Sequence, residues 1–405
     1  MSARQARTAF VGLVADDLTG ATDSAVQFAA AGWDARFVRR PEAIDAEDSD
    51  ASRPRLEAVT TGARASSDDD AAAATTAAVA ALAAAGVDRL FVKVDSTVRG
   101  SVAGQVRGAL TAWRPRHPDA VAIICPAFPD HGRTVVAGTV LVHGEPVALT
   151  AAAHDPVTPV TTSSVSVLFP GTRSVTTDEE ISPATPESFV LDARSNDDLA
   201  RIATTLRRLG PRAVAVGSAG LAHAIAGSEL AERPARTSQR AHWILVAVSS
   251  LHPMAQSQLA RLLETLPDDD LTAAHARPAT VVVATPTEAR PAQQSLDVAA
   301  ALADRVAGEL QQEPYDALVL IGGDGALAVL DRLGAAQIEI IDNLAPGTPH
   351  GTVVGGSAHG LQVVTRSGGF GDINSLARIV NRLRHRPGPA PDALPTVVET
   401  AHRRN

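Results

Sequence analysis

The sequence predicts an α/β protein with two domains, each a mainly parallel sheet flanked by helices. Three observations support this. The chain has 405 residues, more than one ordinary hydrophobic core accommodates. Short apolar runs alternate with helical segments along most of its length, as in parallel sheets. A polar stretch over 228–240 separates two such series, so we expect one domain over 1–235 and another over 240–385. Four prolines in nine residues predict a disordered tail over 386–405.

The overall composition argues against several functional classes. A hydrophobic content of 45% is typical of a globular protein, and a net charge of -9 argues against a general nucleic-acid binder. The single cysteine, Cys125, rules out an intramolecular disulfide and a cysteine-built zinc site. The N-terminal apolar run of about eight residues is too short for a signal peptide or a membrane span. We therefore expect a cytoplasmic protein that binds neither nucleic acid nor a membrane.

The first strand and helix carry a cluster of acids. The sequence VGLVADDLTGATD, residues 11–23, spans the junction between a predicted buried strand over 10–15 and a predicted helix that ends at Ala31. Asp16, Asp17 and Asp23 collect at this junction, where open α/β sheets bind ligands. One of these aspartates could serve only as a helix cap. Three acids together favour a functional site.

The remaining elements repeat the order strand, polar loop, helix. In the first half we expect strands over 35–38, 56–60, 90–94, 121–124, 189–192 and 213–216, with helices over 71–85 and 102–113. In the second half we expect strands over 244–248, 280–284, 317–321, 338–341 and 361–365, with helices over 255–266 and 297–310 and a last helix after 372. A Ser, Thr and Pro-rich segment over 161–188 predicts a loop-rich excursion. The polar loops should converge on one edge of each sheet.

Cations and carboxylates arrive together in the loops of the first half. Lys93, Arg99 and Arg133 join Asp16, Asp17 and Asp95, a mixture that suits a small anionic polyol. Asp95 and Arg99 could equally form a structural ion pair. His131 and His143 are typical of polar surface loops, and we give neither a role.

Glycine follows the strands of the second half. GGDGA, residues 322–326, and SGGFG, residues 367–371, place bare backbone amides at the mouth of a helix, a geometry that receives phosphate oxygens. Ser249 and Ser250 follow a third strand. Together these loops favour a nucleotide. A Walker A motif is excluded, because the only lysine of the chain, Lys93, follows Val92 and not a glycine.

A dinucleotide fingerprint is the main rival interpretation. Gly323, Gly325 and Ala328 match GxGxxA after a strand, and Asp342 closes the next strand about 20 residues later. This spacing alone would indicate an NAD-dependent oxidoreductase of a small hydroxy acid.

Taken together, the motifs resemble the four-carbon acid sugar kinase family. The resemblance extends from about Val11 to Leu376 and rests on ordered blocks: ADDLTGATD, KVDSTVRG, CPAFPDHGR, HDP, GSAG, HP, GGDGA, PGTP and SGGFGD. It implies an N-terminal sugar-acid-binding domain, a C-terminal nucleotide-binding domain and an active site in the cleft between them. It further implies transfer of the ATP γ-phosphate, with Mg²⁺ bound through the nucleotide, to the terminal hydroxyl of threonate, erythronate or 3-oxo-tetronate.

The resemblance also implies which residues form the site. On the sugar-acid side it places Asp16, Asp17, Arg64, Lys93, Asp95 and Arg99; on the ATP side it places Ser250, Gly322, Gly323, Asp324, Gly325, Gly368 and Gly369. We expect Asp17 to be the base or the carboxylate that orients the hydroxyl. Asp16 is the alternate, since neighbours on an extended chain point in opposite directions.

Six positions differ from the family pattern. The pattern has an acid at Thr60, asparagine at Ser101, glutamate at Gln105, glycine at Ser249, threonine at Gly325 and lysine at Arg366. A sugar-acid sensor that has lost the kinase activity is therefore a third hypothesis, beside the kinase and the oxidoreductase. The expected partner is a small sugar acid, and a homo-oligomer is left open.

Lys93 is the only lysine among the 36 basic residues. Arginine has replaced lysine wherever either serves, so this position is predicted to require the compact ammonium group and its three rotatable donors. We therefore expect Lys93 to be catalytic. The alternatives are chance survival and a packed ion pair with Asp95.

Overall fold

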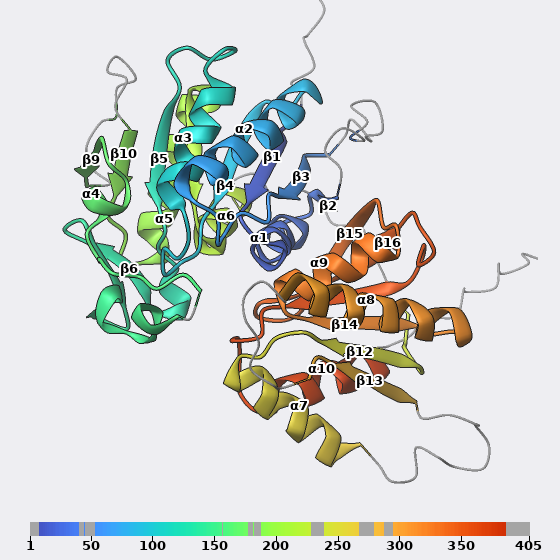
Figure 1. The fold of residues 1–405 in the computed structure, drawn as a ribbon. Coiled ribbons are helices and arrows are strands. Elements are labelled where there is room, and N and C mark those ends of the chain that lie inside the picture. The colour runs from blue at the N-terminus through green and yellow to red at the C-terminus, as the bar shows by residue number, and fades with distance from the viewer. Residues whose placement is uncertain are drawn as a thin grey trace, which may run out of the picture.

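The computed structural model describes residues 8–39, 44, 53–155, 157–176, 181, 188–227, 239–266, 279–286 and 295–385. The predicted tail 386–405 and most of the predicted boundary 235–240 lie outside these residues. The strands form one large sheet in the order β13-β12-β14-β17-β16-β15-β2-β3-β1-β4-β11-β5-β10-β9 (Figure 1). None of the described helices is both long and apolar enough to cross a membrane.

The first half of the chain forms the part of the sheet from β2 to β9, in which every pairing is parallel. Its strands are β1 (Phe10–Ala15), β2 (Asp34–Val38), β3 (Arg55–Thr60), β4 (Arg89–Lys93), β5 (Val121–Cys125), β9 (Thr172–Val175), β10 (Ser188–Leu191) and β11 (Ala213–Gly217). Its main helices are α1 (Leu18–Ala30), α2 (Asp68–Ala84), α3 (Val102–Trp113), α5 (Asn196–Leu209) and α6 (Ala219–Gly227). β5 is buried at every position, as expected of a strand covered by helices on both faces.

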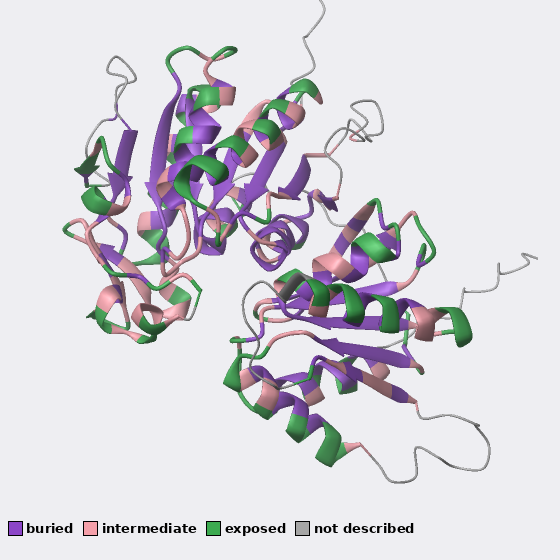
Figure 2. Ribbon diagram, in the orientation of Figure 1, coloured by how far each residue is buried: buried purple, intermediate pink, exposed green. Residues whose placement is uncertain are grey.

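The second half repeats this construction around β14. Its strands are β12 (Ile244–Val248), β13 (Thr280–Ala284), β14 (Ala317–Ile321), β15 (Gln337–Ala345), β16 (Thr348–Val354) and β17 (Gln362–Arg366). Its helices are α7 (Pro253–Thr265), α8 (Ser295–Gln312), α9 (Gly323–Arg332) and α10 (Ser375–Arg384). Buried residues follow the strands, and exposed residues follow the outer faces of the helices (Figure 2). The predicted α/β class with mainly parallel, helix-flanked sheets is confirmed.

Strand β9 lies within the segment 161–188 that is expected to be a loop-rich excursion, and it pairs with β10 at the edge of the main sheet. Two further β-features were not predicted from the sequence. The first is a small antiparallel sheet of β6 (Arg133–Val136), β7 (Thr139–Val142) and β8 (Glu145–Pro146). The second is the hairpin of β15 and β16, of which the sequence indicated only part of β15. Both are antiparallel ribbons, in which pairing to a neighbour decides the conformation more than local preference does.

The two halves join edge to edge, where β2 pairs with β15 in antiparallel orientation. β16 is antiparallel to both β15 and β17, so the parallel strands of the second half run opposite to those of the first. A flat sheet would therefore place the two sets of carboxyl ends at opposite edges. The β15–β16 ladder has register irregularities at Ile340/Asp342 and Asn343/Ala345, and such bulges bend and twist a sheet. In Figure 1 the strands of the second half run across those of the first.

Helix α1 is shared between the halves. It packs against β1, β2 and β3 on one side and against β15, β16, β17 and α9 on the other. The main hydrophobic core continues through this contact and includes both Phe37 and Ile338. A buried hydrogen bond of 2.9 Å joins the hydroxyls of Thr22 on α1 and Thr365 on β17. The first helix of the first half is therefore held directly to a strand of the second half.

The Thr22–Thr365 pair predicts an asymmetric response to mutation. Thr22 Oγ1 also contacts the Leu18 carbonyl at 3.1 Å, so Thr22 retains an acceptor for its proton when Thr365 is changed. In Thr22→Val the Thr365 hydroxyl instead loses its partner in a buried site. We expect Thr22→Val to lower the free energy of unfolding by about 1–3 kcal/mol and Thr365→Val to lower it by less than about 1 kcal/mol.

Urea unfolding followed by tryptophan fluorescence measures both changes, with the double variant as control. Equal losses in the two single variants would contradict this account of the joint.

Candidate active site

The strand register brings the predicted sugar-side residues together. Ala15 of β1 pairs with Thr60 of β3 and with Lys93 of β4, so these three strands end at the same level. Lys93 in turn pairs with Gly217 of β11, whose other neighbour is Cys125 of β5. The loops after β1, β3 and β4 therefore leave the sheet side by side, and they carry all six residues predicted for the sugar-acid side.

Arg64 clamps the two aspartates that follow β1. Its Nε and Nη2 donate to Asp16 Oδ2 and Oδ1 at 2.9 and 2.8 Å, and its Nη1 donates to Asp17 Oδ2 at 2.9 Å. Asp17 is also the N-cap of α1 and accepts from the Gly20 amide at 2.8 Å and from Thr19 Oγ1 at 2.6 Å. Burial opposes ionisation of Asp17, but Arg64 and Lys93 together hold its pKa below the usual value.

The alternate base, Asp16, lies behind this clamp. Its side chain is 0% exposed, and both carboxylate oxygens accept from Arg64. Burial raises the pKa of Asp16, although Arg64 acts in the opposite direction. Asp16 therefore holds Arg64 through both of its oxygens, and Asp17 is the more exposed of the two carboxylates, so Asp16 as the alternate base stays a prediction.

A second arginine clamp follows β4. Arg99 Nε and Nη2 donate to Asp95 Oδ2 and Oδ1 at 3.0 and 2.9 Å, and Arg99 Nη1 donates to Asp155 Oδ2 at 3.0 Å. Asp95 also accepts from the Thr97 amide at 3.0 Å. Burial opposes ionisation of Asp95, but Arg99 above all holds its pKa well below the usual value. The ion pair considered from the sequence is thus present, with Asp155 of the HDP block as its third member.

Lys93 is not part of either clamp. Its side chain is 5% exposed at the end of β4, and its Nζ lies 3.1 Å from the point where a Cβ on Gly20 would stand. Within the described residues Nζ has no hydrogen-bond or ion-pair partner. Lys93 and Asp95 therefore do not form the packed ion pair that was the alternative interpretation. A nearly buried ammonium group without a partner is suited to an anionic ligand.

Asp23 is a third acid at the same place, to which the sequence assigned no role. It lies on α1 one turn after Gly20, and burial raises its pKa to about 6, with Lys93 acting to lower it and Asp17 to raise it. Among the described residues its carboxylate has no hydrogen-bond partner. The sequence signal that could have assigned Asp23 to the site was its position as the last residue of the ADDLTGATD block.

Three loops converge on the nucleotide side. Val248 of β12, Ile321 of β14 and Arg366 of β17 lie at the same level in neighbouring strands. Gly322, at φ 111°, starts the turn into α9, a conformation that favours glycine. A Cβ on Gly368 would lie 1.9 Å from Ser250 Oγ, so these two loops are in close contact. The predicted residues Ser250, Gly322, Gly323, Asp324, Gly325, Gly368 and Gly369 therefore gather around the first turn of α9.

The two groups of residues face each other. A Cβ on Gly323 would stand 3.7 Å from Asp17 Oδ2, so the first turn of α9 lies next to the N-cap of α1. Further out, the His131 ring contacts the Phe370 ring at a centroid distance of 5.4 Å. The clamp that holds Asp17 and the loop that could receive phosphate are thus adjacent.

The dinucleotide fingerprint is contradicted by the topology. Asp342 lies on β15, which is separated from β14 by β17 and β16 in the sheet order. The fingerprint requires its acid at the end of a parallel strand beside the glycine strand. Asp342 instead contacts His350 Nδ1 at 3.0 Å across the β15–β16 hairpin. The match to GxGxxA is accidental.

Two of the six differences from the family pattern meet in one contact. A Cβ on Gly325 would lie 2.2 Å from Ser249 Cβ and 2.4 Å from Ser249 Oγ. Threonine therefore cannot stand at 325 while serine stands at 249. Ser249 Oγ donates to the Ile321 carbonyl at 3.0 Å. Ser249 thus occupies the volume that a side chain at position 325 would need.

Other differences have separate explanations. Arg366 is 3% exposed and donates through Nη2 to the Phe370 carbonyl, so it supports the glycine loop from below. Ser101 donates to the Ser66 carbonyl at 2.5 Å. Gln105 is fully buried, and its amide has no partner within the described part of the chain; nothing in the structure explains this residue.

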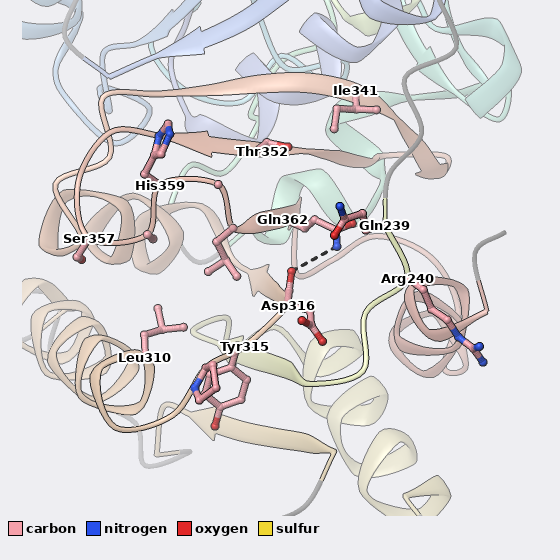
Figure 3. A pocket seen from close by; sticks show the side chains of 14 residues that line it. Gln239, Arg240, Leu310, Tyr315, Asp316, Ile341, Thr352, Ser357, His359 and Gln362 are labelled. Atoms are coloured by element: carbon pink, nitrogen blue, oxygen red, sulfur yellow. Dashed lines mark hydrogen bonds between the residues drawn. The ribbon is translucent and has the colours of Figure 1, made fainter. Parts of the chain in front are cut away.

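A cavity of about 530 Å³ lies elsewhere, between the amino ends of β14 and β17 (Figure 3). This is the edge of the sheet opposite to the glycine loops. Gln362 donates to the Asp316 carbonyl at 3.4 Å, and its Oε1 contacts His350 Nε2 at 3.2 Å. Because these polar groups are bonded within the protein, we assign the cavity no role.

The Ser249–Gly325 contact predicts a compensated pair of mutations. Gly325→Thr alone forces two Cβ atoms within bonding range, so we expect it to abolish the thermal stabilisation by ATP or to prevent folding. Adding Ser249→Gly removes the obstacle, and we expect the double variant to recover most of that stabilisation. Differential scanning fluorimetry with and without ATP measures this, and Ser249→Gly alone is the control. A double variant no better than Gly325→Thr would contradict the coupling.

The raised pKa of Asp23 predicts a pH-dependent gain of stability in Asp23→Asn. An acid whose pKa is higher in the folded state destabilises the fold increasingly as the pH rises from its usual value of 3.8 to about 6, and the penalty is complete above that pH. We expect the variant to gain on the order of 1–2 kcal/mol at pH 7.5 and to lose this gain as the pH falls towards about 4.

Urea unfolding at several pH values tests the Asp23 prediction, with Asp119→Asn in an exposed turn as the matched control. A pH-independent difference between Asp23→Asn and the wild type would contradict it.

Comparisons with known proteins agree with this division of the site. Residues 11–225 match the model of a sugar-binding N-terminal domain, and residues 268–376 match that of a nucleotide-binding C-terminal domain. The chain is 38% identical over 407 residues to a D-threonate kinase of Bordetella bronchiseptica, covering 93% of this chain and 98% of the relative. It is 26% identical to a D-erythronate kinase of Heliobacterium modesticaldum, covering 92% and 96% of the two chains. A 3-oxo-tetronate kinase of Pseudomonas savastanoi is also 26% identical, with 95% and 99% covered.

Solved structures support the fold. A Salmonella typhimurium protein described as a putative tRNA synthase superposes with a TM-score of 0.71 at 19% identity, covering 91% of this chain and 98% of that one. A Haemophilus influenzae protein assigned to DUF1537 gives 0.66 at 18% identity, covering 92% and 100%. At such identities the likeness concerns the fold alone. The two domain models and the relative at 38% identity show that the chain belongs to the four-carbon acid sugar kinase family.

Proposed function

We propose that this protein is an ATP-dependent kinase that phosphorylates the terminal hydroxyl of a four-carbon sugar acid: threonate, erythronate or 3-oxo-tetronate. The observation that carries the proposal is the approach of α9 to Asp17, with 3.7 Å between Asp17 Oδ2 and a Cβ on Gly323. Backbone amides at a helix N-terminus bind phosphate, and a carboxylate can orient a hydroxyl. Their adjacency suits transfer between the two.

The two halves of the chain would divide this work. The sugar acid would bind to the domain expected over 1–235, and ATP to the domain expected over 240–385. Ser250 and the glycines of the two loops would surround the phosphates. No three acidic, histidine or cysteine side chains gather as a metal-ligand set among the described residues. We therefore expect Mg²⁺ to arrive with the nucleotide, where it would neutralise phosphate charge.

Asp17 would orient the acceptor hydroxyl more than it would remove its proton. Its carboxylate already accepts three kinds of donor, from Arg64, Gly20 and Thr19, and its pKa is lowered. Phosphoryl transfer requires little help from a strong base, because positioning and charge neutralisation supply most of the rate. Lys93 would then contact the acceptor oxygen or the transferring phosphoryl group.

The decisive experiment is a coupled assay of ADP release with D- and L-threonate, D- and L-erythronate and their 3-oxo forms. Phosphorus NMR of the product would locate the phosphate on the terminal carbon. Absence of turnover with the whole panel would overturn the proposal. Stabilisation by a sugar acid without ADP release would instead support the sensor hypothesis.

Cellular location and assembly follow as further proposals. We place the protein in the cytoplasm, with a small sugar acid and a nucleotide as its ligands and with neither nucleic acid nor a membrane as a partner. A homo-oligomer stays a prediction that light scattering tests.

The isolated position of Lys93 predicts a strict requirement for lysine. Arginine is longer and planar, and it would have to enter the space beside Gly20 that the ammonium now fills. We expect Lys93→Arg to keep the fold and ATP binding and to lose at least about tenfold in kcat/KM, or roughly 1.4 kcal/mol of transition-state stabilisation.

Steady-state kinetics and scanning fluorimetry measure both properties of Lys93→Arg, and Arg201→Lys on the exposed face of α5 serves as control. Near-normal kinetics in folded Lys93→Arg would show that the lone lysine is incidental.

A further inference from the structure

The two arginines that the family resemblance places on the sugar-acid side already have hydrogen-bond partners within the protein. Arg64 uses Nε, Nη1 and Nη2 on Asp16 and Asp17, and Arg99 uses the same three atoms on Asp95 and Asp155. Each clamp contains two carboxylates and one guanidinium and is therefore one charge negative. With Asp23 beside them, these groups alone would repel a sugar acid.

Two cations at the site stand outside the clamps. One is Lys93, described above. The other is Arg133, the first residue of β6, whose backbone is tied to Phe128 by hydrogen bonds of 2.8 and 3.0 Å. Its Nη1 donates to the His131 carbonyl, while its Nε is buried and has no partner within the described residues. A buried guanidinium donor without an acceptor is costly unless a ligand supplies one.

Arg133 also lies in the right part of the site. It follows β5, which lies beside β11 ending at Gly217, and β11 in turn lies beside β4 ending at Lys93. Burial lowers the pKa of Arg133, while Asp95 acts to raise it and Arg99 to lower it further, so two charges of the second clamp act on this guanidinium. That clamp belongs to the sugar-side half, although His131, whose carbonyl accepts from Arg133, has its ring against Phe370 of the second glycine loop.

We propose that Arg133 binds the carboxylate of the sugar acid and so selects acids over neutral polyols. The inference rests on the proposed function, because it assigns one end of the same substrate. A carboxylate can accept in parallel from two guanidinium donors. Nε and Nη2 of Arg133 make no hydrogen bond within the described residues, and the half-buried side chain would have to turn to present Nε, which the protein covers. Lys93 then remains for the end of the substrate at which the phosphoryl group is transferred. Together the two cations offset the negative charge of the two clamps.

The test compares an acid with its neutral analogue. Wild type and Arg133→Gln are assayed with D-threonate and with threitol, in which a hydroxymethyl group replaces the carboxylate. Binding of both compounds is also measured by calorimetry in the absence of ATP. We expect Arg133→Gln to lose about 10- to 100-fold in kcat/KM and in affinity for D-threonate, with less than about threefold change for threitol. The KM for ATP should stay unchanged.

Two further variants complete the design. Arg133→Lys keeps the positive charge but loses the parallel donors of the guanidinium group. Its kcat/KM and affinity for D-threonate should lie between those of the wild type and of Arg133→Gln, which provides a readout if the glutamine variant fails to fold. Arg201→Gln on α5, whose guanidinium contacts only Asp198 among the described side chains, should match the wild type.

The outcomes separate this inference from the proposed function. Equal losses for D-threonate and threitol, or a raised KM for ATP, would overturn the assignment and indicate a contact with phosphate. Unchanged preference for the acid in a folded variant would also overturn it. A wild type that binds D-threonate but releases no ADP would contradict the kinase and leave the carboxylate assignment to be decided by calorimetry alone.

Discussion

The site depends on the hairpin of β15 and β16. It reverses the strand direction between the two halves, and its bulges at Ile340/Asp342 and Asn343/Ala345 bend the sheet at the joint. Without that bend the carboxyl ends of the two parallel series would lie at opposite edges. With it, α1 packs against β17 and α9, and Gly323 stands beside Asp17. The geometry of a site for two substrates thus follows from one irregular ribbon that belongs to neither set of loops.

Electrostatics within the sugar side follow a simple division. Arg64 and Arg99 each neutralise part of a pair of buried carboxylates, which positions Asp17 and Asp95 and excludes other uses of those guanidinium groups. Buried charges are tolerable in this form because each carboxylate of the two clamps has a cation and hydrogen bonds. Outside the clamps, the Asp23 carboxylate lacks a hydrogen bond, and Lys93 and Arg133 are the cations of this side with unmet bonding capacity among the described residues. A ligand that completes them gains more than one that would have to displace Asp16 or Asp95.

On the nucleotide side, a steric contact explains why two differences from the family pattern occur together. Ser249 and Gly325 each depart from the family pattern, and each departure alone would suggest a damaged loop. In the structure the two residues compete for one volume, so a side chain at either position requires glycine at the other. Arg366, similarly, lies under its loop and holds the Phe370 carbonyl, a support that a different cation could also provide.

The sequence by itself determined the elements and the loops that matter. Apolar runs such as Val121–Cys125 and stop signals such as Gly32 are local, so the strand, loop and helix order could be predicted along most of the chain. The clustering of Asp17, Lys93 and Gly323 near strand ends followed from the same order. Only the tertiary structure decided that β2 pairs with β15, that Arg64 and Arg99 are already bonded, and that Ser249 fills the space over Gly325. These are contacts between residues far apart in the chain, and their distances depend on packing that no local pattern records.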